Sequence, residues 1–296
     1  MGDPPADKFC SISSGKKVIT LLEPYVSIDL DRAEAVALEA ITTSGRLVAE
    51  HFGNGSAFTV ELKRPFDYVT DVDRRSEDLI VDMILDHFGD HHILAEERSE
   101  INFPSGPTWI VDPLDGTTNF IHSFPFVAIS IALMVEGQVV LGMVYDPLRQ
   151  ELFRARRRQG AFLNGVPIRV RNVTVVGDAL MATGFPVANS QLIEPYMETL
   201  REVLQGVSGV RRAGAAALDL AYLACGRVDG FWEIGLKPWD IAAGSLLVAE
   251  SGGTVSDFWG EQKHLNCGHI VAGGPMAHAF LLHLVKSHLA LVLEKP

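Results

Sequence analysis

The chain has 296 residues and a formal net charge of −12 at pH 7, with 47% hydrophobic and 21% charged residues. This composition is typical of a globular protein with one large domain or two packed ones, and the acidic balance argues against direct nucleic-acid binding, which needs a basic surface. The longest apolar run, residues 124–135, is too short to span a bilayer, and the three widely spaced cysteines indicate a reducing compartment; we therefore expect a cytoplasmic protein with no membrane partner.

The first part of the chain predicts helices followed by an antiparallel sheet. Residues 1–28 lack periodicity and are expected to form an N-terminal extension. Apolar residues recur at helical spacing over residues 31–52 and 76–88, and a glycine ends each pattern. Short apolar pieces at 93–95 and 109–111 are typical of strands, and four further strands are predicted over 127–135, 138–145, 151–155 and 161–170. Residues 29–175 therefore form a predicted α+β half that carries most of the candidate metal ligands.

Residues 176–296 alternate between strand and helix patterns, which predicts an α/β half. Strands are expected at 179–184 and 230–233, with two more near 255–257 and 269–272. Helices are expected near 192–204, 214–225, 239–251 and 275–293. We detect no repeat or long linker, so the two halves are predicted to share one cleft in a single compact unit.

The most informative segment is residues 109–120, where an apolar run typical of a buried strand ends at Asp112 and Asp115. Pro113 fixes its own φ and excludes Asp112 from the α region, so Asp112 is expected to end the strand in extended geometry. Gly116 allows a tight turn or the close approach of a ligand. Two neighbouring carboxylates repel each other unless a cation lies between them, and a hard divalent cation with oxygen ligands is the usual solution.

Three further groups of acids stand at the ends of apolar elements. They are residues 70–73, Glu96 with Glu97, and Asp240. Each group alone is typical of solvated surface. Glu96 and Asp112, however, both follow strand-like runs, and open sheets bind ligands beyond the ends of their strands. We therefore expect these acids to converge on one site.

In three blocks the chain resembles the inositol monophosphatase family of magnesium-dependent, lithium-sensitive phosphatases. The blocks are residues 95–97, 112–120 and 239–244, the last followed by 250–253. With shorter agreements between them, the resemblance covers nearly the whole chain and is far more specific than a lone motif. It implies an α/β fold, the layered αβαβα sandwich of that family.

The resemblance also implies a metal site. In the family, one Mg²⁺ is held by the residues that match Glu96, Asp112 and the backbone carbonyl of Leu114. A second Mg²⁺ is bridged by Asp112 and held by Asp115 and Asp240, and many descriptions add a third ion near Glu96. All four carboxylates are present in this sequence. Two or three Mg²⁺ ions are therefore expected.

The chemistry implied by the family is hydrolysis of a phosphate ester by an activated water, with no covalent intermediate. Thr117 and Asp73 match a Thr–Asp pair that orients or deprotonates this water. If Gly116 and Thr117 open a helix, as in the family, their N–H groups point at the phosphate. Glu96 is expected to act in catalysis as well as in metal binding, and Glu97 is expected to support the ligands from behind.

Substrate recognition is implied mainly for the second half of the chain. The matching residues are Gly116, Thr117, Arg211, Gly214, Ala216, Glu233 and Asp240. Arg212 is an alternative to Arg211 for the same contact. Family members carry Ser or Thr after the glycine that matches Gly214, so Ala215 removes a hydroxyl here.

The resulting hypothesis is a Mg²⁺-dependent phosphomonoesterase, a homodimer, that acts on myo-inositol monophosphate as its small-molecule partner. The same chemistry on fructose 1,6-bisphosphate, histidinol phosphate or a 3′-phosphonucleotide is the nearest alternative. Residues 118–120 and 231–233 favour the inositol branch. An alternative of another class is a regulatory, protein-binding protein that keeps the same fold.

Overall fold

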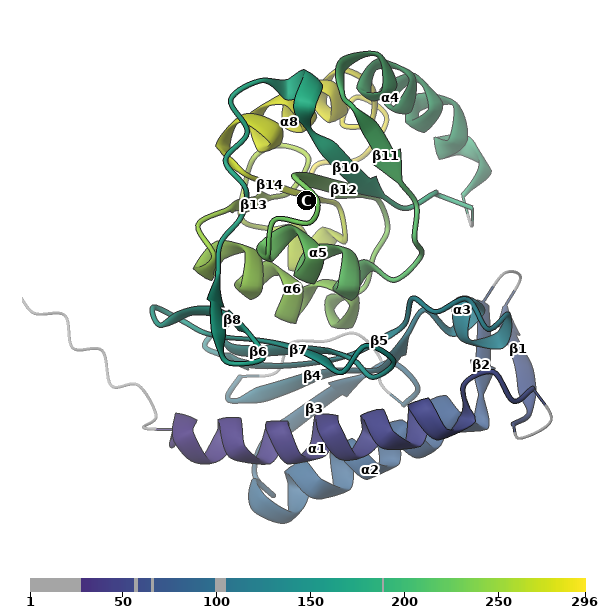
Figure 1. The fold of residues 1–296 in the computed structure, drawn as a ribbon, viewed down its shortest axis with the longest axis vertical. Helices are drawn as coiled ribbons and strands as arrows, with labels where there is room; N and C mark the ends of the chain where they lie inside the picture. Colours follow the sequence, from purple (N-terminus) through teal and green to yellow (C-terminus); the bar gives the residue numbers. More distant parts are fainter. Residues whose placement is uncertain (1–27, 56–57, 65–66, 99–104, 188) are drawn as a thin grey trace, which may run out of the picture.

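The computed structural model describes residues 28–296 except 56–57, 65–66, 99–104 and 188. Helices and sheets alternate in five layers (Figure 1). The helical layers are α1 (Leu30–His51) with α2 (Asp71–His87), α5 (Ala216–Ala224) with α6 (Pro238–Glu250), and α4 (Ile193–Gly206) with α8 (Pro275–His288). The expected αβαβα sandwich is confirmed. The prediction of an N-terminal extension falls, except for Ile28, outside the described residues.

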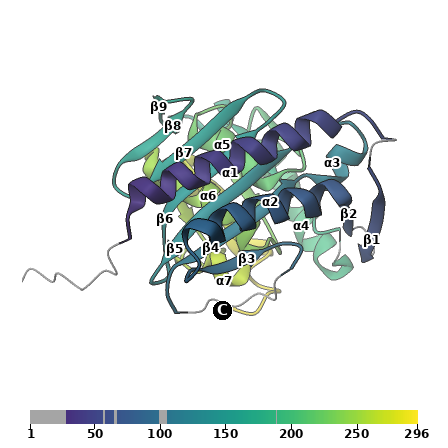
Figure 2. The same cartoon turned by 90° about the horizontal axis from the view of Figure 1, so that it is seen from below.

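The lower sheet has seven strands. Its spatial order is β3 (His92–Ala95), β4 (Thr108–Asp115), β5 (Ala128–Val135), β6 (Gln138–Asp146), β7 (Glu151–Arg156), β8 (Gly160–Leu163) and β9 (Val166–Ile168). β3 and β4 are parallel, and every later pair is antiparallel, which confirms the predicted meander. Helices α1 and α2 lie side by side across its outer face (Figure 2). Both helices bury an apolar stripe against the sheet, as their sequence periodicity predicts.

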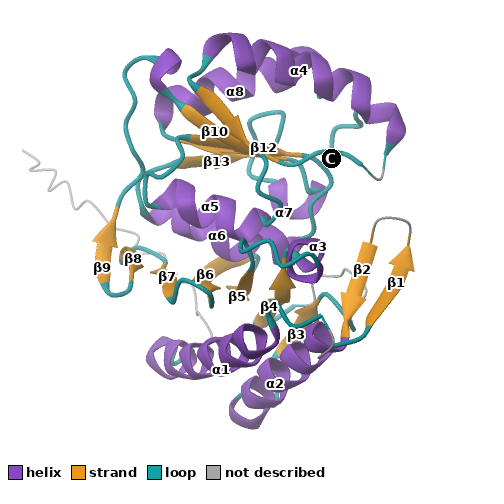
Figure 3. Ribbon diagram, turned by 45° about the vertical axis from the view of Figure 1, so that its right-hand side comes forward, coloured by secondary structure: helices purple, strands orange, loops and turns teal. Residues whose placement is uncertain are grey.

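The upper sheet has five strands. Its order is β11 (Gly209–Arg211), β10 (Leu180–Thr183), β12 (Gly230–Glu233), β14 (Ile270–Gly273) and β13 (Thr254–Ser256). β10 runs parallel to β11 and β12, whereas β14 is antiparallel to both of its neighbours. The remaining elements are the hairpin of β1 (Val60–Arg64) and β2 (Asp67–Thr70), the short helices α3 (Thr117–Ile121) and α7 (His264–Cys267), and the 3₁₀ turns η1 (Val176–Asp178) and η2 (Ser190–Leu192). Figure 3 shows the hairpin standing apart from both sheets, near α3.

Helix α6 lies between the two sheets and is apolar on nearly all sides. Small residues allow it to approach its neighbours closely. A Cβ on Gly142 of β6 would lie 3.0 Å from the Ala243 backbone, and one on Gly244 would lie 2.6 Å from the Cβ of Leu220. Because the backbones of α6 and β6 are nearly in contact, the helix is fixed in position relative to the lower sheet.

The predicted helix over residues 76–88 begins five residues earlier, at Asp71. The cause is a capping box: the Thr70 side chain accepts from the Asp73 N–H, and the Asp73 carboxylate accepts from the Thr70 N–H. Asp73 is therefore held in the first turn of α2. Polar residues in this turn hide the apolar periodicity, which explains the error.

Two further boundaries differ from the prediction. The strand expected over 161–170 is a hairpin of β8 and β9, because Asn164 and Gly165 adopt left-handed φ values of 48° and 81° and turn the chain. The last helix ends at His288 and not at residue 293. Within the described ranges, no helix combines the length and the hydropathy needed to cross a membrane.

Candidate active site

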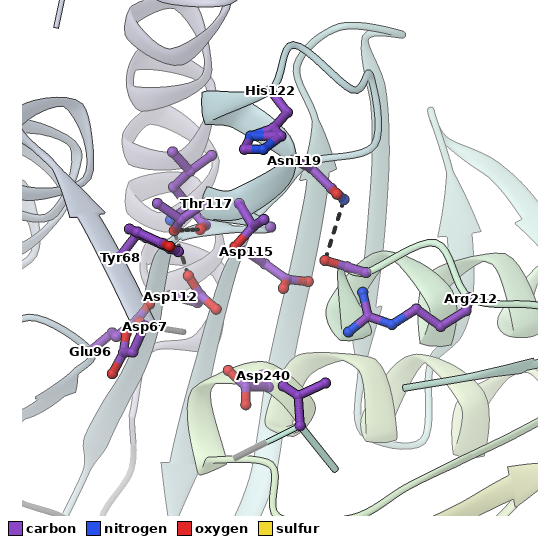
Figure 4. A pocket seen from close by; sticks show the side chains of 15 residues that line it. Asp67, Tyr68, Glu96, Asp112, Asp115, Thr117, Asn119, His122, Arg212 and Asp240 are labelled. Carbon is purple, nitrogen blue, oxygen red and sulfur yellow. Dashed lines mark hydrogen bonds between the residues drawn. The ribbon is translucent and has the colours of Figure 1, made fainter. Parts of the chain in front are cut away.

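Four of the acids expected to converge line one pocket of about 510 Å³, at the edge where β4 ends and α6 begins (Figure 4). The expected residues on its wall are Glu96, Asp112, Leu114, Asp115, Gly116, Thr117, Gly214 and Asp240. They come from elements of both halves of the chain. Residues from separate segments between positions 96 and 240 therefore line the same cavity.

A β-bulge brings Asp112 and Asp115 to the same side of β4. Residues three apart in a regular strand point to opposite faces. Here Asp112 pairs with Ser130 and Asp115 with Ala128, so two residues of β4 lie opposite one residue of β5. Pro113 cannot donate a ladder hydrogen bond, and it lies inside this bulge. The Asp-Pro-Leu-Asp spacing is therefore what directs both carboxylates into the pocket.

Hydrogen bonds from two helix N-termini orient the next two acids. The Asp115 Oδ2 accepts from the Ala217 N–H in the first turn of α5, at 2.7 Å. The Asp240 Oδ2 accepts from the Lys237 N–H at 2.7 Å, which caps α6. Free N–H groups at a helix N-terminus favour a carboxylate, so Asp115 stabilises the start of α5 and Asp240 stabilises the start of α6.

Thr117 and Asp73 form the predicted pair. The Thr117 hydroxyl donates to Asp73 Oδ1 at 2.8 Å and lies 3.1 Å from the Leu114 carbonyl oxygen. The second oxygen of Asp73 accepts from the N–H and hydroxyl of Thr70 at 2.9 and 2.5 Å. Gly116, just before Thr117, has a φ of 91° and caps α3, as a glycine can without strain.

Glu96 and Glu97 meet a cation from the hairpin. Lys63 Nζ lies 3.2 Å from Glu96 Oε1 and 2.6 Å from Glu97 Oε1. The Glu97 N–H donates to the Glu77 carboxylate of α2 at 2.7 Å, which fixes the turn after β3. Glu97 therefore contacts Lys63, the ion-pair partner of Glu96, and does not line the pocket wall. This is the position expected of a residue that supports the ligands from behind.

Burial makes ionisation of these carboxyls unfavourable. It raises the pKa of Glu96 to about 8, and the charges of Asp240 and Glu97 add to the effect. Burial likewise raises the pKa of Asp115 and of Asp240 to about 7, and that of Asp112 well above its usual range. Each acid also repels at least one of the others. A cation in the pocket would remove this penalty, because it stabilises the ionised forms.

The chemistry of the donor set fits a hard divalent cation, since every candidate ligand is an oxygen. Across the described part of the chain, however, no group of three or more His, Cys, Asp or Glu side chains stands close enough to hold a metal ion. The hydrogen bonds explain the spread: Lys63 draws Glu96 outward, while α5 and α6 hold Asp115 and Asp240. These four acids share the pocket wall but are not grouped closely enough in this conformation to coordinate one ion.

The basic residue in the pocket is Arg212 and not Arg211. Arg211 is exposed on β11, and its guanidinium donates to the Val210 carbonyl. The Arg212 side chain lines the pocket and lies over the Phe185 ring, 5.4 Å from its centroid. Ala216 lies behind the pocket wall, where its N–H bonds to Asp115. Of the two arginines that the sequence offers for substrate contact, the pocket geometry therefore favours Arg212.

Glu233 ends β12 and is close to the pocket wall without forming part of it. Burial raises its pKa to about 8, the nearby Arg212 opposes this, and the charges of Asp240 and Asp115 reinforce it. Gly184 makes room for this carboxylate, since a Cβ there would lie 1.8 Å from Glu233 Oε1. The glycine at the end of β10 was a usable signal that sequence reasoning overlooked.

Sequence reasoning also missed Asp67, Tyr68, His122 and Asn119, which all line the pocket (Figure 4). Asp67 and Tyr68 belong to a hairpin whose short strands gave no clear pattern. The Asn119 amide donates to the carbonyls of Phe126, Ala213 and Gly214, at 2.8, 2.9 and 3.3 Å. It ties α3 to the loop before α5, and so joins the two halves at the pocket.

Known proteins share this sequence and architecture. The model of the inositol monophosphatase family matches residues 29–290. The chain is 42% identical over 261 residues to the Nus factor SuhB of Escherichia coli, covering 88% of this chain and 98% of that protein. It is 44% identical over 256 residues to the inositol-1-monophosphatase of Mesorhizobium japonicum, covering 86% and 96%. The crystal structure of the extragenic suppressor protein suhB from Bartonella henselae has a TM-score of 0.82 at 41% identity, covering 86% and 98%.

Proposed function

Because this chain belongs to the inositol monophosphatase family, we propose that it is a magnesium-dependent phosphomonoesterase that hydrolyses myo-inositol monophosphate to inositol and phosphate. The observation that carries the proposal is the convergence of four buried carboxylates with a Thr–Asp pair on one pocket. Buried carboxylates that repel one another lower the stability of the metal-free protein. Their presence is best explained if they bind a cation. A reaction at a phosphate group fits this arrangement.

The proposed ligands of Mg²⁺ are Glu96, Asp112, Asp115, Asp240 and the Leu114 carbonyl, for two or three ions. Bound Mg²⁺ neutralises phosphate oxygens and lowers the pKa of an attacking water. The protein's own part is orientation. The bulge in β4 sets Asp112 and Leu114, and helix termini set Asp115 and Asp240.

Asp73 and Thr117 supply the proton acceptor. The Thr117 hydroxyl donates its proton to Asp73, so its lone pairs are free to accept a hydrogen bond from water. Burial raises the pKa of Asp73 to about 6, against the hydrogen bonds from Thr70 and Thr117. A base with a pKa near 6 is ionised at neutral pH and can take up the proton of water through Thr117.

Arg212 and Glu233 are proposed to recognise the substrate. Arg212 offers a permanent cation in an acidic pocket, suited to a phosphate oxygen that Mg²⁺ does not reach. Glu233 stands behind it and can accept hydrogen bonds from ring hydroxyls. Gly116 and Gly214 line the same pocket, and both adopt left-handed φ values that favour glycine. The same pocket chemistry on fructose 1,6-bisphosphate, histidinol phosphate or a 3′-phosphonucleotide remains the alternative.

The test is phosphate release from a panel of these esters, with Mg²⁺ and with EDTA. We expect Mg²⁺-dependent turnover with the highest kcat/KM for inositol monophosphate. Asp112→Asn should abolish turnover, because both main ions are proposed to use that carboxylate. Near-normal turnover by Asp112→Asn at saturating Mg²⁺, or equal turnover in EDTA, would refute the proposal.

A second candidate is a regulatory role as a Nus factor, which the name of the Escherichia coli relative supports. A gene-replacement experiment distinguishes the enzymatic function from the regulatory one. The Asp112→Asn variant should fail to replace the wild-type gene in its own organism if turnover is the function. Full replacement by this inactive variant would favour the regulatory role.

We also propose a homodimer in the cytoplasm. The supporting feature is an apolar groove of about 200 Å³ beside the pocket, lined by residues 185–187, Ile193, Tyr196 and Met197. Met197 is 47% exposed, at a position where a charge would be tolerated by a monomer. Light scattering should give the mass of two chains for wild type and of one chain for Met197→Glu; equal masses would count against this surface.

A further inference from the structure

One face of α2 contacts two of the segments that carry proposed metal ligands, the β4 bulge and the turn after β3, and it also contacts Thr117. Asp73, Ser76 and Glu77 stand at positions i, i+3 and i+4, so their side chains lie on the same face. All three are buried, with exposed fractions of 0%, 0% and 2%. Asp73 is explained by its bond to Thr117. Ser76 and Glu77 have no part in the proposed chemistry.

Ser76 reaches the bulge in β4. Its hydroxyl donates to the Pro113 carbonyl oxygen at 2.7 Å, and the Ser44 hydroxyl of α1 lies 2.5 Å from it. A serine has one O–H, and Ser76 uses its own on Pro113, so Ser44 is the donor to Ser76. A buried chain of hydrogen bonds therefore runs from the outer helical layer to the segment between Asp112 and Leu114.

This bond matters because a bulge has fewer ladder bonds to hold it. The peptide unit between Pro113 and Leu114 is fixed at both ends. Its oxygen accepts from Ser76, and its N–H donates to Asp112 Oδ1 at 3.0 Å. The plane of this peptide sets the direction of the Asp112 carboxylate and of the Leu114 carbonyl that follows.

Glu77 does the same for the turn after β3. Its Oε2 accepts from the Glu97 N–H at 2.7 Å, and its Oε1 accepts from Arg98 Nε at 2.8 Å. The backbone on which Glu96 stands is therefore bonded to α2. Asp78, on the exposed side of the same helix, bonds to the Arg98 guanidinium, whereas Glu77 also holds the backbone of the turn through the Glu97 N–H.

We infer that Ser76 and Glu77 are positioning residues for the metal site, which they preorganise through the β4 bulge and the turn after β3. This inference rests on the proposed function. Loss of either residue leaves all candidate ligands in place but lets their oxygens move. Metal affinity should then fall, while kcat at saturating Mg²⁺ stays close to the wild-type value.

The experiment is calorimetric titration of metal-free protein with Mg²⁺, combined with kcat and the Mg²⁺ concentration for half-maximal turnover. Residues that orient metal ligands typically change affinity by about 10-fold to 100-fold. We therefore expect Ser76→Ala and Glu77→Ala to weaken Mg²⁺ binding by about 10-fold or more. Glu77→Gln keeps an acceptor for the Glu97 N–H and should recover part of the loss.

Two control variants separate positioning from general damage. Asp78→Ala removes an ion pair with Arg98 and should leave Mg²⁺ binding unchanged. Thr199→Val removes a buried hydroxyl that is bonded to the Pro195 carbonyl within α4 and does not line the pocket, and it matches Ser76→Ala in kind. It should lower stability without changing Mg²⁺ affinity.

If Ser76→Ala does not fold, Ser44→Ala carries the test. It keeps the Ser76–Pro113 bond and removes only its support, so a smaller weakening in the same direction is expected. Folded Ser76→Ala and Glu77→Ala that bind Mg²⁺ as the wild type does would overturn the inference alone. Wild-type protein that binds no Mg²⁺ would overturn the proposed function with it.

Discussion

Asp240→Asn should make the metal-free protein more stable while removing its activity. Asparagine has the shape of aspartate and keeps an oxygen to accept from the Lys237 N–H, so the cap of α6 survives. It carries no charge, so its burial in the pocket costs less and it does not repel Asp115. One of the three carboxylates proposed to hold the second Mg²⁺ is lost at the same time.

The magnitude follows from the pKa. Burial, with the charge of Asp115, raises the pKa of Asp240 from 3.8 to about 7. A difference of this size between the unfolded and folded states corresponds to about 4 kcal/mol of stability. Neighbouring carboxyls titrate together and share the cost, so we expect a gain of about 2 kcal/mol from one substitution. In thermal unfolding this is an increase of about 4 °C in Tm.

The sign of the pH dependence is fixed. An acid with a raised folded-state pKa binds more protons in the folded than in the unfolded state between pH 4 and 7. The stability of the wild type therefore falls as pH rises through this window. The gain from Asp240→Asn should be full above about pH 7 and vanish toward pH 4.

The assay is thermal unfolding in EDTA from pH 5 to 8, repeated in saturating Mg²⁺, with exposed Asp178→Asn as the control. Mg²⁺ should raise the Tm of the wild type more than that of Asp240→Asn. The advantage in Tm that the variant has in EDTA should therefore shrink or reverse. Equal Tm values at pH 8 in EDTA, or a gain that does not change with pH, would refute the electrostatic argument.

Three further outcomes are expected. Asp73→Asn should lower kcat by about 10²-fold to 10⁴-fold, and wild-type kcat should fall below a pH of about 6 as Asp73 becomes protonated; an unchanged pH–rate profile in the variant would remove Asp73 as the base. Glu233→Ala should raise KM for inositol monophosphate more than for a simple aryl phosphate, and equal changes would exclude it from ring recognition. Lithium should inhibit by competing at the second metal position, so full activity across millimolar lithium would point to another branch of the family.

Part of the site was predictable because some of its residues are adjacent in sequence. Asp112 and Asp115 stand in one short segment, and Pro113 between them indicates an irregular strand end. The layered fold was likewise predictable, since long helices and a meander of apolar strands leave few ways to pack. The αβαβα order followed from the family resemblance, and alternation of elements in the second half agrees with it.

The remainder depends on contacts that no local pattern encodes. β11 is only three residues long, and so short a strand has no alternation that indicates which of Arg211 and Arg212 faces the pocket. Lys63 reaches Glu96 from a hairpin whose strands are mostly exposed and lack a core-facing pattern. The start of α2 was not predicted because its first turn is polar. These polar residues cap the helix and build the site, and are not there because the turn faces solvent.

The close contact of α6 with β6 has a consequence for how this protein tolerates change. Asp240 belongs to α6, which is packed between the two sheets, and α6 closely approaches the lower sheet at Gly142. A methyl group added at Gly142 would push α6 away from β6 at Ala243, about one helical turn from Asp240, and would so shift the Asp240 carboxylate. Some positions that tolerate substitution least should therefore take no part in the reaction. They are recognisable only by the lack of space around them.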